Sequence, residues 1–243
     1  MTTDLTEREL TPRLSTQALG RHAVFLETVD STNTVAMQRA HEGAVHGTLV
    51  VANHQTAGRG RLGRTWISPP HSNLYASAVL RYTVPASTLA EWLSWVPLLT
   101  AMGLADAIEQ VTGVVVGLKW PNDLFIHDRK LGGILCESGG RERGAPHVIV
   151  GFGLIVNVTQ ADFPPNLQSL ATSLHHETGR TWDRPQLLAA ILIHLEQTYT
   201  VFLEGDRASL LTRYQQRCVS LGRRVQVLYA NGDSFTGVAQ AIS

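Results

Sequence analysis

The sequence is poor in cysteine, with only Cys136 and Cys218 among 243 residues. The two make no C-x-x-C pair and no spacing typical of a metal site, and they are too few for the disulfide framework of a small secreted domain. We therefore expect both to be ordinary buried thiols in a protein of a reducing compartment.

Long apolar runs and an excess of one charge are also absent. No apolar run approaches the roughly 18 residues that indicate a membrane helix, and no charged-then-apolar leader opens the chain. The 20 basic and 20 acidic residues balance, so no overall field attracts nucleic acid and any anion site must be local. These features predict a cytoplasmic protein that binds neither membrane nor DNA.

Several catalytic motifs are missing as well. There is no G-x-S-x-G elbow, no H-E-x-x-H pair and no Walker loop, so the usual support for a hydrolase or a zinc enzyme is lacking. A hydrophobic content of 44% and a charged content of 16% over this length predict one large globular domain with a small appendage.

The richest concentration of hydrogen-bond donors lies in residues 53–66, NHQTAGRGRLGRTW, of which residues 57–66 are called the Arg/Gly loop below. Glycines let backbone N–H groups approach a phosphate, and guanidinium groups bind phosphate or carboxylate in a bidentate way. The spacing G-x-G-x-x-G also matches a dinucleotide fingerprint, but Pro69 and Pro70 prevent the helix that must follow, and residues 78–88 contain no acid. The sequence favours an anion site, with a solvated turn as the alternative for the loop taken alone.

Hydrophobic periodicity and turn residues predict an α+β order of elements. Strands are expected at 22–29, 73–80, 114–119, 130–137 and 148–158, and a hairpin at Asn231-Gly232. Helices are expected to begin at the cap 30–33, at the capping box Thr88-x-x-Glu91, at Asp183 and near Asp206, with a kink or break at Pro97. The segment 159–181 has many turn residues and is typical of a functional loop or lid.

Three shorter stretches carry further chemistry. Lys119-Trp-Pro-Asn122-Asp123 brings an amine, an amide and a carboxylate to one strand end, where the carboxylate is a candidate ligand of Mg²⁺. Lys130 stands just before two glycines, as a point charge for an anion. Gly151-x-Gly153, inside an apolar strand, indicates a close approach by backbone or ligand. Each is a weak signal by itself.

Taken together and in order, these stretches resemble the biotin protein ligases. The resemblance spans residues 22–243 and rests on Asp30-Ser-Thr-Asn33, Gln55-Thr-Ala-Gly-Arg-Gly-Arg-Leu-Gly-Arg64, Lys119-Trp-Pro-Asn-Asp123, Lys130-Leu-Gly-Gly133 and Gly151-x-Gly153. It implies a mixed β-sheet backed by helices, as in class II aminoacyl-tRNA synthetases and biotin ligases, plus a small SH3-like C-terminal domain. We expect a polar tail at 1–20, a catalytic domain at 21–220 and an apparently truncated β domain at 221–243, as in the monofunctional members without a DNA-binding domain.

The resemblance also implies the reaction and its residues. Biotin would be activated by ATP with Mg²⁺ as biotinyl-5′-AMP and passed to a lysine of a biotin carboxyl carrier protein, by a monomer or homodimer. Catalysis is assigned to Arg61, Lys130, Lys119 and Asp123, with Asp123 also the candidate metal ligand. Biotin is assigned to Ser31, Thr32, Asn33, Gln55, Gly58, Arg59, Arg61, Lys130, Gly133, Gly151 and Gly153. ATP is assigned to Arg61, Arg64, Trp66, Asn122, Lys130 and Asn157, and residues 159–174 would fold over the adenylate.

One position departs from the family pattern. The strand usually reads G-x-G-x-N-V-N, whereas Ile155 stands here at the first asparagine. Loss of a hydrogen bond to a charged group costs roughly 1.5 to 3 kcal/mol, so we expect weaker use of ATP, with Asn157 as a partial substitute. A lipoate–protein ligase and a non-catalytic biotin or adenylate binder remain alternatives.

Overall fold

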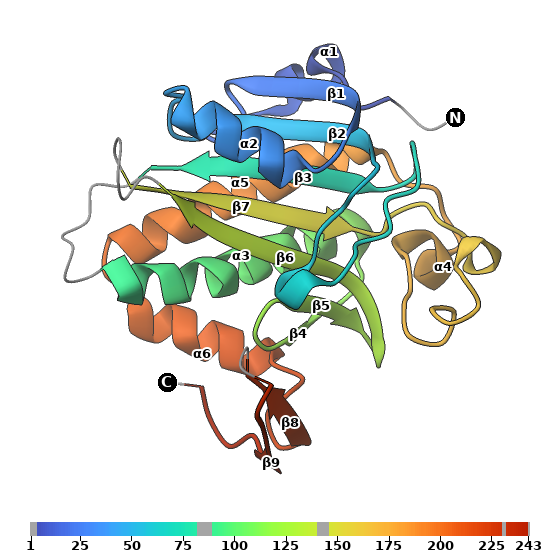
Figure 1. Ribbon diagram of the computed structural model, residues 1–243, viewed down its shortest axis with the longest axis vertical. Helices are drawn as coiled ribbons and strands as arrows, with labels where there is room; N and C mark the ends of the chain where they lie inside the picture. Colours follow the sequence, from blue (N-terminus) through green and yellow to red (C-terminus); the bar gives the residue numbers. More distant parts are fainter. Residues whose placement is uncertain (1–3, 82–88, 140–145, 230–231, 243) are drawn as a thin grey trace.

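The computed structural model describes residues 4–81, 89–139, 146–229 and 232–242. Its centre is a seven-stranded sheet in the order β1-β2-β3-β7-β6-β5-β4 (Figure 1). The first two strands are parallel and every other neighbouring pair is antiparallel, which confirms the expected α+β fold with a mixed sheet. The strands are β1 Ala23–Val29, β2 Leu49–Gln55, β3 Leu74–Leu80, β4 Gly117–Lys119, β5 Asp123–Ile126, β6 Arg129–Gly139 and β7 His147–Leu154.

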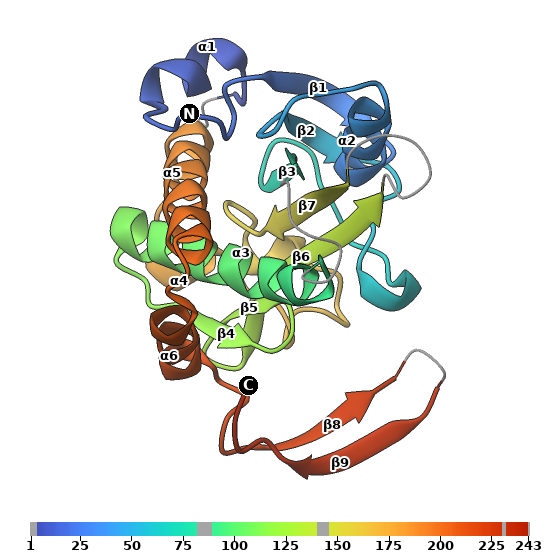
Figure 2. The same ribbon diagram turned by 90° about the vertical axis from the view of Figure 1, so that its left-hand side faces the viewer.

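Helices cover both faces of the sheet. Helix α2, Thr32–His41, lies on one face, whereas α3 (Leu89–Thr112), α5 (Arg184–Leu203) and α6 (Arg207–Arg217) lie on the other (Figure 2). Because neighbouring strand residues point to opposite faces, Val50, Val79 and Ile149 pack under α2, while the alternate residues join the main core with α3 and α5.

Helix α3 is continuous through Pro97, so the break expected there does not occur. Trp92, Leu99 and Met102 of this helix are buried. The expected cap Thr88 lies outside the described residues. Helix α5 is long and apolar enough to cross a membrane by length and composition, but half of that stretch is buried in the protein, as in a core helix.

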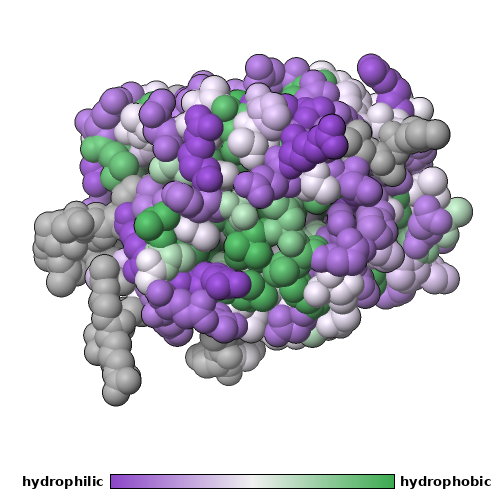
Figure 3. Space-filling view, turned by 90° about the horizontal axis from the view of Figure 1, so that it is seen from above, coloured by the Kyte–Doolittle hydropathy of each residue, from purple (hydrophilic) through white to green (hydrophobic). Residues whose placement is uncertain are grey.

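Residues 4–19 do not form the expected polar tail. They contain α1 (Glu7–Leu10) and a short 3₁₀ turn, η1 (Thr11–Arg13), and they bury the side chains of Leu5, Leu10, Leu14 and Leu19 in the main core. The Glu196 carboxylate of α5 also accepts hydrogen bonds from the N–H groups of Ala18 and Leu19, at 2.7 and 2.9 Å. Seen from above relative to Figure 1, the molecular surface has a hydrophobic centre bordered by hydrophilic residues (Figure 3). Leu5, Leu10, Leu14 and Leu19 stand five, four and five positions apart, which does not sustain a helical period, so only packing against α5 reveals them as core.

The region after β3 differs from expectation in its strands. No strand was expected at Asp123–Ile126, but these residues form β5, which pairs with both β4 and β6. The strand expected at 148–158 ends at Leu154, and the chain continues through η4 (Gln160–Asp162) and α4 (Leu174–Thr178). Ile155, Val158, Phe163 and Ala171 make a small apolar cluster within this segment. Lys130 of β6 also bonds to the backbone of Leu170 and Thr172, so this part of the expected lid lies against the sheet.

The chain ends in a separate two-stranded sheet of β8 (Arg224–Leu228) and β9 (Ser234–Val238). The hairpin was expected, although Asn231 of its turn lies outside the described residues. Gly232 has a φ of 91°, a conformation that favours glycine. Leu228, Phe235 and Val238 are more than half exposed on these strands.

His46, between α2 and β2, gives the fold a pH dependence. Its Nδ1 accepts a hydrogen bond from the Arg81 N–H at 3.1 Å, and burial lowers the pKa of His46 below 6.5, with the Glu196 carboxylate opposing that effect. The unfolded chain therefore binds more protons at this site, so the free energy of unfolding should fall as the pH drops below about 6.5. Urea unfolding at about pH 7.5 and about pH 5.5 should show a smaller loss for His46→Gln than for the wild type. An equal loss in both proteins would contradict this assignment.

Candidate active site

A single cavity brings together most of the polar residues singled out in the sequence. It lies between the Arg/Gly loop, the start of α2 and the strands β6 and β7. Of the residues assigned to a site, the lining contains Ser31, Thr32, Asn33, Gln55, Arg59, Arg61, Arg64, Trp66, Asn122, Asp123, Lys130, Gly133, Gly151 and Gly153.

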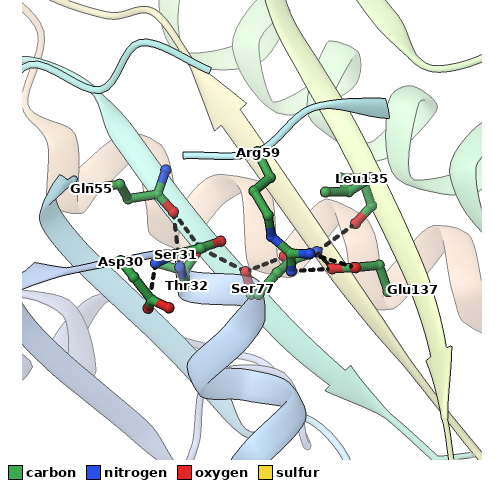
Figure 4. Close-up of polar contacts among 9 residues, drawn as sticks. Asp30, Ser31, Thr32, Gln55, Arg59, Ser77, Leu135 and Glu137 are labelled. Carbon is green, nitrogen blue, oxygen red and sulfur yellow. Dashed lines mark hydrogen bonds and ion pairs between the residues drawn. The ribbon is translucent and has the colours of Figure 1, made fainter. Parts of the chain in front are cut away.

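The polar floor of the cavity is built by the start of α2 and the end of β2. The N–H and hydroxyl of Thr32 both donate to Gln55 Oε1, at 2.9 and 3.2 Å. Ser77 of β3 places its hydroxyl 2.8 Å from Thr32 Oγ1 and 2.6 Å from Asn33 Oδ1 (Figure 4). Ser31 caps α2 without a side-chain hydrogen bond, so its hydroxyl is not used in the capping that the sequence favoured.

The Arg/Gly loop folds back on itself over this floor. Gly60 N–H donates to Arg64 O at 2.7 Å, and Trp66 N–H donates to Gly58 O at 2.8 Å. A Cβ on Gly58 would lie 2.4 Å from Trp66 O, so this glycine permits the turn. Gly58 does not line the cavity, in contrast to its assignment to biotin.

Two glycines of β7 make room for the opposite wall. A Cβ on Gly151 would lie 1.9 Å from Asn33 Oδ1, and a Cβ on Gly153 would lie 2.5 Å from the Trp66 ring. The interpretation of Gly151-x-Gly153 as a place of close approach therefore agrees with the geometry, and the approaching groups are Asn33 and Trp66.

The cationic side of the cavity is formed by Arg61 and Lys130. Lys130 Nζ lies 2.8 Å from Asp123 Oδ1 and 5.5 Å from the centre of the Trp66 ring. Arg61 Nη1 donates to Asn122 Oδ1 at 3.0 Å. The backbone carbonyl of Asn122 accepts a hydrogen bond from the Ile134 N–H of β6, and its side-chain amide donates to Ile134 O, which fixes the β4–β5 turn against the sheet. Two positive groups thus line the same cavity as the polar floor.

Other assigned residues lie outside the cavity or are already paired with other groups. Lys119 is exposed, with its Nζ 4.8 Å from the centre of the Phe125 ring, and it does not line the cavity. Asn157 is engaged with the backbone of Trp182, donating to its O at 3.0 Å and accepting from its N–H at 2.9 Å. Its amide cannot therefore replace the asparagine that is missing at Ile155. Arg59 is also committed, because both its Nη atoms donate to Glu137, at 3.0 and 2.8 Å.

Comparison with known proteins identifies this arrangement. Residues 25–154, more than half of the chain, match the model of the biotin/lipoate A/B protein ligase family. The chain is 33% identical to the bifunctional ligase/repressor BirA of Bacillus subtilis, over 98% of this chain and 72% of BirA. It is also 33% identical to the biotin–[acetyl-CoA-carboxylase] ligase of Mycobacterium tuberculosis, over 98% of this chain and 86% of that ligase. The chain belongs to the biotin protein ligase family.

The fold agrees with solved structures of biotin protein ligases. The ligase of Aquifex aeolicus in complex with biotin and ATP superimposes with a TM-score of 0.76 at 30% identity, covering 92% of this chain and 88% of that one.

A magnesium ion fits the cationic side of this biotin protein ligase site only through Asp123. Within the described residues no group of three or more His, Cys, Asp or Glu side chains could hold a metal by itself. Mg²⁺ bound with a nucleotide is often held by one or two carboxylates and by the phosphates, and Asp123 meets that requirement. Cys136 is no candidate nucleophile, because burial raises the pKa of its thiol to about 12 even though the Arg61 charge acts in the other direction.

Sequence reasoning missed some residues of the site. Gly60, Thr65, Ile134, Leu135 and Phe152 line the cavity, and Ser77 and Glu137 hold its polar groups in place. Glu137 and Ser77 carry no local signal, because neither belongs to a motif that states its chemistry. Gly60 and Thr65 lie within the Arg/Gly loop and could have been included from the motif itself.

Proposed function

We propose that this chain is a biotin protein ligase that activates biotin with ATP and transfers it to a lysine of a biotin carboxyl carrier protein. The observation that carries the proposal is the convergence of Arg61 and Lys130 above the polar floor of Thr32, Asn33 and Gln55, in a chain that is similar over its length to biotin ligases. The floor offers hydrogen-bond donors and acceptors to the neutral, polar ring of biotin. Arg61 and Lys130 offer positive charge to the biotin carboxylate and to the phosphate of ATP.

The first half-reaction joins two anions. A biotin carboxylate oxygen attacks the α-phosphorus of ATP, the bond to the bridging oxygen breaks, and pyrophosphate leaves with the electron pair. Repulsion between the carboxylate and the phosphates is the main barrier that the protein can lower. Arg61 and Lys130 stabilise the charge that develops, since Asn122 and Asp123 already hold their side chains in place.

The second half-reaction uses the mixed anhydride as an acyl donor. The neutral amine of the carrier lysine attacks the biotinyl carbonyl carbon, AMP leaves with the electron pair of the broken C–O bond, and the amine loses a proton. Trp66 and the Arg/Gly loop cover the cavity and would keep water from the anhydride.

Asp123 would hold Mg²⁺ together with the phosphates, and the ion would supply further positive charge to the nucleotide. We also propose the cytoplasm as the compartment, supported by the two free thiols, Cys136 and Cys218.

The decisive measurement is pyrophosphate release with ATP, Mg²⁺ and either biotin, lipoate or no acid, without any carrier. Release with biotin alone is expected. Release with lipoate alone would make the chain a lipoate ligase. If the protein melts at a higher temperature with biotin but releases no pyrophosphate, it is a binder and not a ligase.

The Ile155→Asn variant tests the departure from the family pattern. Adding an amide at this position is expected to lower the KM for ATP by about tenfold, the worth of one hydrogen bond to a charged group. It should also lower the Tm, because Ile155 packs with Val158, Phe163 and Ala171. Ile155→Val, which removes a methyl group without adding an amide, should leave the KM for ATP within about twofold. An unchanged KM in Ile155→Asn would contradict the assigned role of this position.

A further inference from the structure

Glu137 of β6 joins two parts of the site that are far apart in the sequence. Its carboxylate accepts hydrogen bonds from both Nη atoms of Arg59, in the Arg/Gly loop, at 3.0 and 2.8 Å. It also accepts one from Asn33 Nδ2, at the start of α2, at 2.7 Å. We call these contacts of Glu137 with Arg59 and Asn33 the Glu137 latch, and Figure 4 shows its Arg59–Glu137 pair.

Hydrogen bonds continue from the latch beneath the cavity to the other end of the loop. Asn33 Oδ1 and Thr32 Oγ1 are both within bonding distance of the Ser77 hydroxyl, and Thr32 donates to Gln55 Oε1. Gln55 Nε2 then donates to Ser68 Oγ at 3.0 Å, and Ser68 donates to Trp66 O at 3.3 Å. One chain of polar contacts therefore anchors the loop at Arg59 and at Trp66 and passes through the floor in between.

The tip of the loop is held much less firmly than its two anchors. Leu62 at the tip has a φ of 56° and is 58% exposed, and a Cβ on Gly63 would meet nothing within 4 Å. With the loop in this position the cavity has a volume of about 140 Å³, less than the roughly 300 to 1,000 Å³ typical of small-molecule sites. Displacement of the loop, and with it of the anchors, would enlarge the cavity for a nucleotide adduct.

We infer that Glu137 is a positioning residue that latches the Arg/Gly loop, so that Arg59 closes the cavity instead of binding the substrate anion. The inference rests on the proposed function and divides the loop arginines into two roles. Arg61, which is held by Asn122, faces the substrate anion. Arg59 does not, because Glu137 neutralises its charge. Because Asn33 and Thr32 belong to the same chain of contacts, a ligand that orders the floor also favours the closed loop.

The charges around the latch fit this role. The Arg59 side chain is 45% exposed and that of Glu137 is 29% exposed, so the pair is only partly shielded from water. A pair of this kind contributes little to the stability of a fold, but bidentate geometry fixes the orientation of the guanidinium. Removing it should therefore free the loop without unfolding the domain.

The test compares Glu137→Gln, Arg59→Met and the double variant with the wild type and with Glu42→Gln. The last variant breaks a surface pair of similar exposure, Arg39–Glu42, at the end of α2 and away from the cavity. Each protein is digested with limiting trypsin in the absence of ligand, and cleavage after Arg61 and Arg64 is followed by mass spectrometry. The KM for biotin, kcat for pyrophosphate release and the rate of adenylate loss are then measured.

The latch predicts faster cleavage in the loop for Glu137→Gln and Arg59→Met, by about tenfold, and none of this change for Glu42→Gln. The KM for biotin and the rate of adenylate loss should rise by about tenfold, while kcat changes much less. The double variant should equal Glu137→Gln, because the contact that Arg59→Met breaks is already broken in Glu137→Gln. Effects of the two single variants that multiply in the double variant would show that Arg59 contacts the substrate and would overturn the inference.

The digestion needs no activity, so its outcome is independent of the proposed reaction. Unchanged cleavage in Glu137→Gln with an unchanged KM would refute the latch while leaving the ligase proposal intact. A wild type that releases no pyrophosphate would refute the ligase proposal, and faster cleavage in Glu137→Gln would then still establish the latch as a contact that closes the loop.

Discussion

Replacing Lys130 with alanine is expected to slow biotin-dependent pyrophosphate release by about 10²- to 10³-fold, the usual cost of removing one preorganised donor from a developing negative charge. Lys130 Nζ is held by Asp123 at 2.8 Å and lies over Trp66 on the cationic side of the cavity. The loss should appear in kcat, since the charge to be stabilised is largest in the transition state. Single-turnover formation of the adenylate, with ATP in excess, measures the step directly.

Lys119 provides the matched control, because the chain has only these two lysines. Lys119 lies outside the cavity, next to Phe125, so Lys119→Ala should change adenylate formation by less than about threefold. A large loss in Lys119→Ala, or a small one in Lys130→Ala, would contradict the assignment of the anion site. Lys130→Arg should recover part of the rate, since it keeps the charge but not the reach of the amine.

Gly151→Ala is expected to raise the KM for biotin by roughly 5- to 150-fold, which corresponds to the 1 to 3 kcal/mol typical of overpacking. The added Cβ would lie 1.9 Å from Asn33 Oδ1 and would push that side chain from its place in the floor. Asn33 would then lose its contacts with Ser77 and Glu137. Titration of biotin by calorimetry, without ATP, isolates the effect on binding.

Gly153→Ala, two residues along the same strand, separates the two ends of the cavity. Its Cβ would meet the Trp66 ring at 2.5 Å, so its main effect should be on the KM for ATP and not on the affinity for biotin. Identical effects of the two variants on biotin would contradict the placement of the floor and the cationic side at different ends. Thermal unfolding of both variants checks that neither change has simply destabilised β7.

The order of the elements and most of the cavity followed from local sequence. The Arg/Gly loop, the Asn122-Asp123 turn, Lys130 and the β7 glycines all carry motifs whose residue types state their chemistry, and these motifs meet in one cavity. Strands β1, β3 and β6 and helices α2, α5 and α6 were expected close to where they lie, because alternation, caps and turn residues act over a few positions.

Contacts between distant segments could be decided only by the tertiary structure. The leucines of residues 5–19 became core because α5 lies against them, and β5 became a strand because β6 offers it an edge. Asn157 turned away from the site because the Trp182 backbone binds it. Arg59 and Glu137 stand 78 positions apart, and Asn33 and Glu137 stand 104 apart. A motif states which groups are available, whereas the partner that neutralises each group comes from another strand or helix, and no local pattern records that pairing.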